Sequence, residues 1–285
     1  MKFYKAELHT HTTHSDGKFT PQELADTAIS EGIQVLAITD HNASTGTGGL
    51  KANDKLIVIP GIEWTTFWGH VVVLGGNSKV DWRTVNPRTC EEKIREAHGA
   101  GDAVILAHPR RLSGPVCSGC FFEMPLGDYI GVTGIEVCSS EPSKAERGSP
   151  EAYKMWRDLL DGGKKIGAFY GRDWHGKIKY NPMYTYVGAE EFTPQAILAG
   201  ILAKRVFITS KTMVPVITLY SCGNPFYYGD TVPAHDIEIT SNCKDIMLTG
   251  KDFSVSVDFK GDLAPGYYFL QTKEKDFISS PFYVK

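Results

Sequence analysis

The chain has 285 residues, and its 30 Lys and Arg nearly balance its 33 Asp and Glu, which leaves a net charge of −3. The basic residues form no run, so the charge pattern argues against duplex nucleic acid and anionic membranes as partners. No apolar stretch approaches the roughly 20 residues that a helix needs to span a bilayer. A hydrophobic content of 42% is typical of a globular protein, and the lack of a signal-peptide core favours a cytoplasmic location.

A segment near the start of the chain places several candidate metal ligands close together. Residues 2–8 have the pattern of a strand, and successive side chains of a strand point to opposite faces. His9 and His11 therefore share one face where this strand ends, and Asp16 follows in the next loop. Imidazoles beside a carboxylate suit a metal ion, although two strand histidines without a metal fit this segment equally well.

Alternating helices and strands are predicted up to residue 210. Helices begin at capping residues, most of them followed by Pro: Thr20-Pro21, Thr89, Ser149-Pro150 and Thr193-Pro194. Short apolar runs typical of buried strands lie at residues 35–39, 56–59, 70–74, 103–107, 134–138 and 166–170. This alternation predicts βα units with a parallel sheet, and the number of strands favours a barrel over an open sheet.

The pattern changes near residue 212, after which no helical periodicity is found. Runs rich in β-branched and aromatic residues alternate there with turns that contain Gly and Pro. We therefore expect an α/β barrel over residues 1–212 and a small, sandwich-like all-β domain over residues 213–285. Cys117 and Cys120, in a long irregular segment, are expected to be free thiols.

Histidines and carboxylates concentrate at the ends of the predicted strands. Six of the nine histidines are found there: His9, His11, His41, His70, His108 and His175. The same kind of position is occupied by Asp16, Asp40, Glu63 and Asp173. Because functional groups at the carboxyl ends of barrel strands converge in space, these residues predict a shared metal site.

Five short motifs resemble, in order, those of the PHP (polymerase and histidinol phosphatase) family of metallohydrolases. They are His9-x-His11 with Ser15-Asp16-Gly17, Thr39-Asp40-His41, Gly61-x-Glu63, His108-Pro109 and Asp173-x-His175. Gly69-His70 and Gly134-Ile-Glu136 are similar to the CehA/McbA-type branch of that family. The resemblance covers roughly residues 5–210 and implies a distorted (β/α)7 barrel with two to three divalent ions of Zn, Mn or Fe.

The resemblance also implies which residues bind each ion. The first ion would be bound by His9, His11, Glu63 and Asp173. Glu63 would bridge to a second ion, which would also be bound by His70 and His108. The third ion would be bound by Asp16, His41 and His175. Asp40 is expected to orient a ligand histidine rather than to bind an ion itself.

The implied chemistry is hydrolysis of a small phosphate ester or a nucleotide by a hydroxide that bridges two ions. Glu63, His108 and Asp173 would serve this reaction directly. Two alternatives remain open. The CehA/McbA likeness suggests a metal-dependent hydrolase of a carbamate, carboxyl ester or amide, and a metal-binding regulatory protein without turnover is the other.

Several further side chains have two possible roles each. Arg110 and Arg111 would clamp the phosphate, or else form a solvated pair in a loop. Arg172 replaces the Ser of the family pattern Gly-Ser-Asp-x-His, and would bind either an anionic oxygen of the substrate or a carboxylate in the barrel wall. An aromatic pocket or simple packing would explain Trp64, Phe67 and Trp68.

Overall fold

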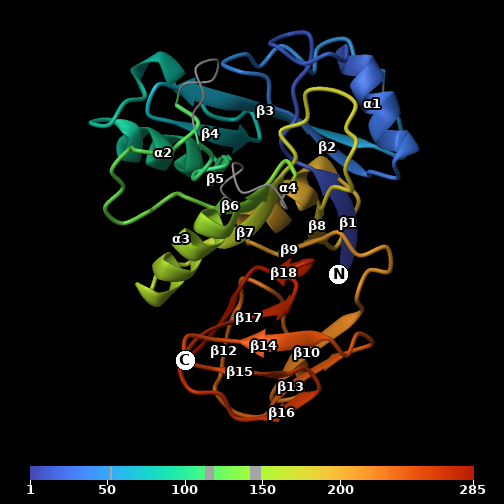
Figure 1. The fold of residues 1–285 in the computed structure, drawn as a ribbon, viewed down its shortest axis with the longest axis vertical. Coiled ribbons are helices and arrows are strands. Elements are labelled where there is room, and N and C mark those ends of the chain that lie inside the picture. The colour runs from blue at the N-terminus through green and yellow to red at the C-terminus, as the bar shows by residue number, and fades with distance from the viewer. Residues whose placement is uncertain (52, 113–118, 142–148) are drawn as a thin grey trace.

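The computed structural model describes residues 1–51, 53–112, 119–141 and 149–285. Figure 1 shows the helices gathered in one part of the molecule and strands alone in the other, with β18 lying between β9 and β17. None of the described helices has both the length and the apolar character needed to cross a membrane.

One large sheet runs through the molecule in the order β12-β19-β17-β18-β9-β8-β1-β2-β3-β4-β5-β6-β7. The strands of its first part are β1 (Lys2–Glu7), β2 (Val35–Ile38), β3 (Ile57–Thr66), β4 (Gly69–Leu74), β5 (Ala103–Leu106), β6 (Gly134–Ser139), β7 (Gly167–Gly171), β8 (Tyr184–Ala189) and β9 (Val206–Thr209). Strands β1, β2 and β3 are parallel, as are β5, β6 and β7.

The prediction of an all-parallel sheet is wrong at two places. Strand β4 is antiparallel to both β3 and β5, and β8 is antiparallel to both β1 and β9. Only Phe67 and Trp68 connect β3 to β4, and a two-residue connection can join only antiparallel neighbours because a parallel pair needs a long crossover. The structure is therefore a mixed α/β fold.

The closed seven-stranded barrel stays a prediction. Strand β7 is the last strand in the order of backbone pairing. Its backbone is connected to β8 and to the segment after β18 by hydrogen bonds to side chains. The amide of Tyr170 donates to Thr185 Oγ1 (3.2 Å), and that of Ala168 donates to Ser280 Oγ (3.0 Å). These contacts draw β7 toward β8 and toward the residue that follows β18.

The helices are α1 (Pro21–Ser30), α2 (Cys90–Gly99), α3 (Ser149–Asp161) and α4 (Pro194–Leu202), with a 3₁₀ turn at Trp82–Thr84. The predicted capping box at Thr20 and Glu23 is present, and Thr193 caps α4 by accepting from the amide of Ala196. Thr89 precedes α2 but makes no cap, because its hydroxyl accepts from the amide of Asn86 (3.1 Å) instead of a helix amide.

Alternate residues of the central strands contribute to two separate apolar clusters. In β4, Val71 belongs to the cluster that contains Trp156 of α3, whereas Val72 belongs to the one that contains Ile197 of α4. Successive strand residues point to opposite faces, so the sheet is buried on both sides. This double burial explains the continuous apolar runs in the sequence.

The described residues after Leu202 form strands and no helix. Their bounds are β10 (Ile217–Ser221), β11 (Asn224–Pro225), β12 (Thr231–Val232), β13 (Ile237–Ser241), β14 (Ile246–Thr249), β15 (Ser254–Ser256), β16 (Phe259–Gly261), β17 (Gly266–Thr272), β18 (Phe277–Ser279) and β19 (Phe282–Val284). A second sheet has the order β11-β10-β13-β16. Strand β18 pairs with β9, so the large sheet continues past residue 212, and the division into two domains there stays a prediction.

One prediction about the cysteines is wrong. Cys120 is disulfide-bonded and is not a free thiol, and Cys117 lies outside the described residues. Among the described residues, the free cysteines are Cys90, Cys138, Cys222 and Cys243.

Candidate metal centre

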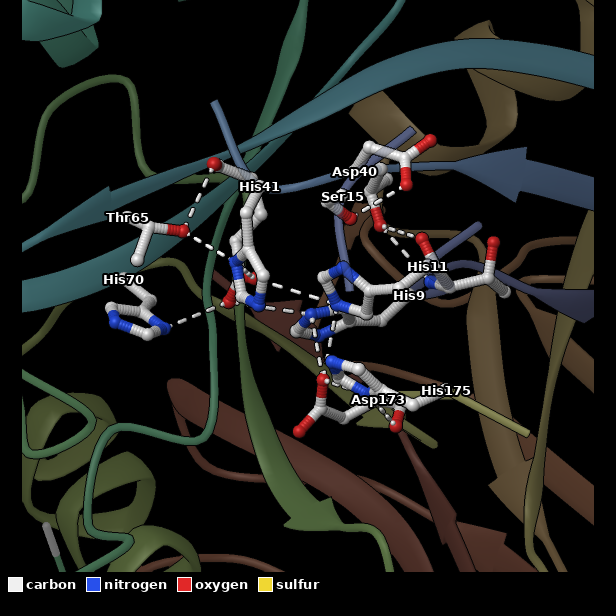
Figure 2. A network of polar contacts seen from close by, with 12 residues as sticks. His9, His11, Ser15, Asp40, His41, Thr65, His70, Asp173 and His175 are labelled. Carbon is white, nitrogen blue, oxygen red and sulfur yellow. Dashed lines mark hydrogen bonds and ion pairs between the residues drawn. The ribbon is translucent and has the colours of Figure 1, made fainter. Parts of the chain in front are cut away.

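The predicted ligands meet where β1, β2, β5 and β7 end and where β3 and β4 join. Figure 2 shows side chains turned toward one another for His9, His11, His41, His70, Asp173 and His175. Backbone contacts extend the sheet at this point. The amide of Trp174 donates to the carbonyl of His9 (3.1 Å), and the amide of His11 donates to the carbonyl of Trp174 (3.0 Å). A further bridge pairs His41 with Glu63. The backbone therefore fixes the segments that carry the ligands against one another.

All nine predicted ligands belong to groups whose donor atoms lie within 4.8 Å of one another. The groups are His9, His11 and Glu63; His9, His108 and Asp173; His41, Glu63 and His70; and His11, Asp16, His41 and His175. Shared members link the four groups into one continuous cluster. The structure thus brings together residues that are up to 166 positions apart, from His9 to His175.

Glu63 occupies the middle of this cluster and is completely buried. Its Oε1 lies near three imidazoles: His9 Nε2 (3.3 Å), His70 Nδ1 (3.1 Å) and His108 Nε2 (3.2 Å). Its Oε2 faces two others: His41 Nδ1 (2.7 Å) and His11 Nε2 (3.5 Å). Because each oxygen faces its own set of imidazoles, this carboxylate has the geometry to bridge two cations.

Asp173 approaches the cluster from the far end of the sheet. Its Oδ1 lies 3.1 Å from His11 Nε2 and 3.4 Å from His175 Nδ1. Its backbone has a φ of 53°, in the left-handed region that non-glycine residues rarely adopt. Such strain persists only where the surroundings impose it, and it is common at functional sites.

Many buried polar atoms of the cluster have no hydrogen-bond partner within the described parts of the chain. They are His9 Nε2, both ring nitrogens of His11, His70 Nε2, Glu63 Oε2 and Asp173 Oδ1. Buried polar groups are normally paired, because an unpaired one costs about 1–3 kcal/mol. Imidazole nitrogens and carboxylate oxygens are also the donors that divalent transition metals prefer. The residues present therefore fit divalent metal ions.

Two acids of the cluster, Glu63 and Asp173, are ionised despite their burial. Burial raises the pKa of Glu63, but the charge of His9 and hydrogen bonds from neighbouring imidazoles hold that pKa well below its usual range. Burial also raises the pKa of Asp173, but Arg111 and His11 hold it well below its usual range. Both residues are carboxylates at neutral pH, which is the form that binds cations.

The surroundings shift the pKa values of two imidazoles of the cluster in opposite directions. Burial lowers the pKa of His108, and the charge of Arg111 lowers it further, so this ring is neutral and ready to bind a cation. Burial also lowers the pKa of His9, but Glu136 and Glu63 raise it well above its usual range. A cation that binds His9 therefore competes with a proton.

Glu136, on β6, was not predicted as a site residue, yet it contacts two of the predicted ligands. His9 Nδ1 donates to its Oε1 (2.7 Å), and the backbone amide of His108 donates to its Oε2 (2.7 Å). A carboxylate behind a ligand imidazole fixes the ring's tautomer and orientation. The Gly134-Ile-Glu136 motif was the only signal of this role in the sequence, and spacing alone could not reveal its partner.

The prediction that Asp40 orients a ligand histidine is wrong. Its Oδ1 accepts from the Thr12 amide (2.7 Å) and from Ser15 Oγ (2.7 Å), and its Oδ2 accepts from Thr12 Oγ1 (2.8 Å). Figure 2 shows Asp40 beside Ser15. Asp40 therefore orders the loop that carries Asp16.

The three candidate arginines have different surroundings. Arg172 is only 1% exposed, and it lies 2.7 Å from Glu7 and 2.9 Å from Glu31, so the geometry favours the ion pair over the substrate contact. Arg111 donates to Asp173 and to Ser140, and its Nε has no hydrogen-bond partner in the part of the chain that the structure describes. Arg110 stacks on the ring of Phe121.

Comparison with known proteins identifies a PHP domain in this chain. A model of the PHP domain matches residues 7–99. The chain is 33% identical to the uncharacterized protein MJ1587 of Methanocaldococcus jannaschii over 150 residues, which are 47% of this chain and 80% of that protein. It is 30% identical to the 5'-3' exoribonuclease Rnm of Salmonella typhimurium over 115 residues, which are 33% of this chain but only 39% of the exoribonuclease.

A solved structure supports the fold. It is a two-domain protein of Bacteroides vulgatus described as containing a predicted PHP-like metal-dependent phosphoesterase. The superposition has a TM-score of 0.54 at 15% identity and covers 99% of this chain and 94% of that one. Together, the ordered motifs, the clustered ligands and these matches show that the chain belongs to the PHP domain family.

Proposed function

We propose that this chain is a metal-dependent phosphoesterase that hydrolyses a small phosphate ester or a nucleotide. The observation that carries this proposal is the position of Glu63, whose two carboxylate oxygens face separate sets of imidazoles. A family that includes a named exoribonuclease and a structural neighbour described as a phosphoesterase favours phosphorus over carbon as the reacting centre.

The cluster would hold two to three cations. His9, His11, Glu63 and Asp173 would hold the first, His70 and His108 would share Glu63 with the second, and Asp16, His41 and His175 would hold the third. Bound divalent cations lower the pKa of water, polarise a phosphoryl oxygen and stabilise in-line displacement. The choice among Zn, Mn and Fe is not fixed by imidazole and carboxylate donors.

Arg111 is the residue best placed to contact the phosphate. Its guanidinium is held by Asp173 and Ser140, so its orientation is fixed beside a ligand of the cluster. Its buried Nε–H lacks a partner, and an anionic phosphoryl oxygen would provide one. Arg172 would act differently, because its ion pairs with Glu7 and Glu31 support the strand end that leads into Asp173.

A second candidate is hydrolysis of a carbamate, carboxyl ester or amide at the same cations. It is favoured by Glu136, which belongs to the CehA/McbA-like motif and lies directly behind the ligand His9. A regulatory protein without turnover is less well supported, because all nine ligands are present and clustered.

Hydrolysis assays separate these candidates. The protein loaded with Mn²⁺ or Zn²⁺ is tested on nitrophenyl phosphate, bis(nitrophenyl) phosphate and nitrophenyl acetate. We expect turnover of a phosphate ester, and its loss in Glu63→Gln by more than the roughly 10–100-fold that removal of an outer partner costs. Glu151→Gln, on the exposed side of α3, is the matched control. Turnover of the acetate alone would reject the phosphoesterase.

A further inference from the structure

Two aromatic side chains are exposed at the tip of the hairpin that carries two ligands. Strand β3 contains Glu63 and β4 contains His70, and only Phe67 and Trp68 connect these strands. Phe67 is 68% exposed and Trp68 is 37% exposed, whereas Trp64 on the same strand is 1% exposed. Trp64 thus packs in the core, and the two tip residues forgo the roughly 1.5–3 kcal/mol that burial of a large apolar side chain provides.

The backbone of this tip is held in place. The carbonyl of Trp68 accepts from the amide of Glu123 (2.7 Å), and Thr66 Oγ1 donates to the carbonyl of Gly69 (2.7 Å). Gly69 has a φ of 148° and lies against Phe122, which leaves no room for a Cβ there. The two rings are therefore presented by an ordered turn, with their centroids 5.9 Å apart and their planes at 78°.

A positively charged side chain lies on the segment that contacts this tip. Arg110 comes two residues after the ligand His108, and its guanidinium carbon lies 5.0 Å from the centre of the Phe121 ring. Arg110 and Phe121 also form a backbone bridge. Glu123, whose amide donates to the carbonyl of Trp68, follows Phe121 by two residues. Among the described residues, no carboxylate pairs with Arg110.

The position of the tip determines which part of a substrate could reach it. With a strand rise of about 3.3 Å per residue, Trp68 lies about 7 Å along the chain from His70, and Phe67 about 13 Å from Glu63. The tip therefore lies at the rim of the cluster, within reach of the alcohol portion of an ester whose phosphate is bound at the centre of the cluster.

We propose that Phe67 and Trp68 bind a planar aromatic ring in the alcohol portion of the substrate, with Arg110 supplying a cation at the same rim. This inference rests on the proposed phosphoesterase and narrows its substrates to esters that carry such a ring. Aromatic side chains stack on planar rings and cations add to that attraction, and removal of one stacking partner costs about tenfold in affinity.

A pair of substrates that differ only by a planar ring tests this proposal. AMP and ribose 5-phosphate share the phosphate and the sugar, and only AMP carries the base. We expect kcat/KM to be about tenfold higher for AMP. Trp68→Ala and Phe67→Ala should remove most of that preference by lowering the AMP value alone, and Trp68→Phe should restore it. Tyr220→Ala, an exposed aromatic on β10, is the control.

Equal values for the two substrates in the wild type would overturn the proposal, and so would equal losses for both in the alanine variants. If neither phosphate ester is hydrolysed, the proposed phosphoesterase activity is rejected. The proposed aromatic site can still be tested by binding. Calorimetry then compares binding of AMP and ribose 5-phosphate to the metal-loaded protein. Tighter binding of AMP that disappears in Trp68→Ala supports the aromatic site, and equal binding refutes it.

Discussion

Glu136 Oε1 lies 2.7 Å from His9 Nδ1, on the side of the ring that faces away from Glu63. The imidazole therefore donates from Nδ1 and leaves Nε2 for a cation, which is the tautomer that a metal site requires. Glu136 also accepts from the amide of His108, so one buried carboxylate orients two ligands.

Loss of this carboxylate should weaken metal binding without unfolding the protein. We expect Glu136→Gln to lower metal affinity by about 10–100-fold. The Gln amide would hold the His9 ring less firmly than the carboxylate does, and it would raise the basicity of His9 Nε2 by less. Competition with a coloured chelator measures the affinity, and circular dichroism checks the fold. Wild-type affinity in this variant would show that His9 does not depend on Glu136.

Arg172 should matter for stability rather than for substrate binding. Its removal leaves Glu7 buried without its partner, and breaking a buried ion pair in this way costs about 3–5 kcal/mol. We expect Arg172→Met to lower the free energy of unfolding in urea by that amount, whereas Arg83→Met, at a solvent-exposed ion pair, should leave it nearly unchanged. A raised KM at unchanged stability would instead place Arg172 at the substrate.

Asp40 should control the third set of ligands through the loop from Thr12 to Asp16. Removing its carboxylate deprives the Thr12 amide and two hydroxyls of their acceptor, so Asp16 loses its fixed position. We expect Asp40→Ala to bind one metal ion fewer per chain, as measured by elemental analysis, and Asp26→Ala on the exposed face of α1 to bind the full number. Equal metal content in both variants would contradict this role.

Thiol chemistry should play no part in the reaction. Burial raises the pKa of Cys90 to about 12 and that of Cys138 to about 12, so both thiols stay protonated and unreactive at pH 8. Iodoacetamide should modify the exposed Cys222 in the native protein and spare these two, with hydrolysis unchanged. Mass spectrometry reads the labelling, and inactivation that follows alkylation of Cys138 would contradict the prediction.

The sequence predicted which polar side chains cluster better than it predicted what surrounds them. His9, Glu63 and Asp173 could be located because polar groups at strand ends leave a pattern of residue type and position along the chain. The partner of Arg172 could not be found, because Glu7 and Glu31 are its neighbours only in the folded sheet.

The fold shows the same limit. Apolar runs and capping residues located most helices and strands, including β4 (Gly69–Leu74), which contains the apolar run predicted at residues 70–74. Strand direction was missed because an apolar run looks alike in parallel and antiparallel pairing, and only the short Phe67-Trp68 connection between β3 and β4 carried that information. Tyr184–Ala189 was missed as a strand because its residues lack a long apolar run.

The central claim is that cations bind on both sides of the Glu63 carboxylate, and anomalous diffraction from metal-loaded crystals tests it most directly. The account predicts at least two anomalous peaks, each about 2.0–2.2 Å from an oxygen of Glu63 and from nitrogens of the surrounding histidines. Crystals with full metal occupancy elsewhere in the molecule and no peak beside Glu63 would contradict it.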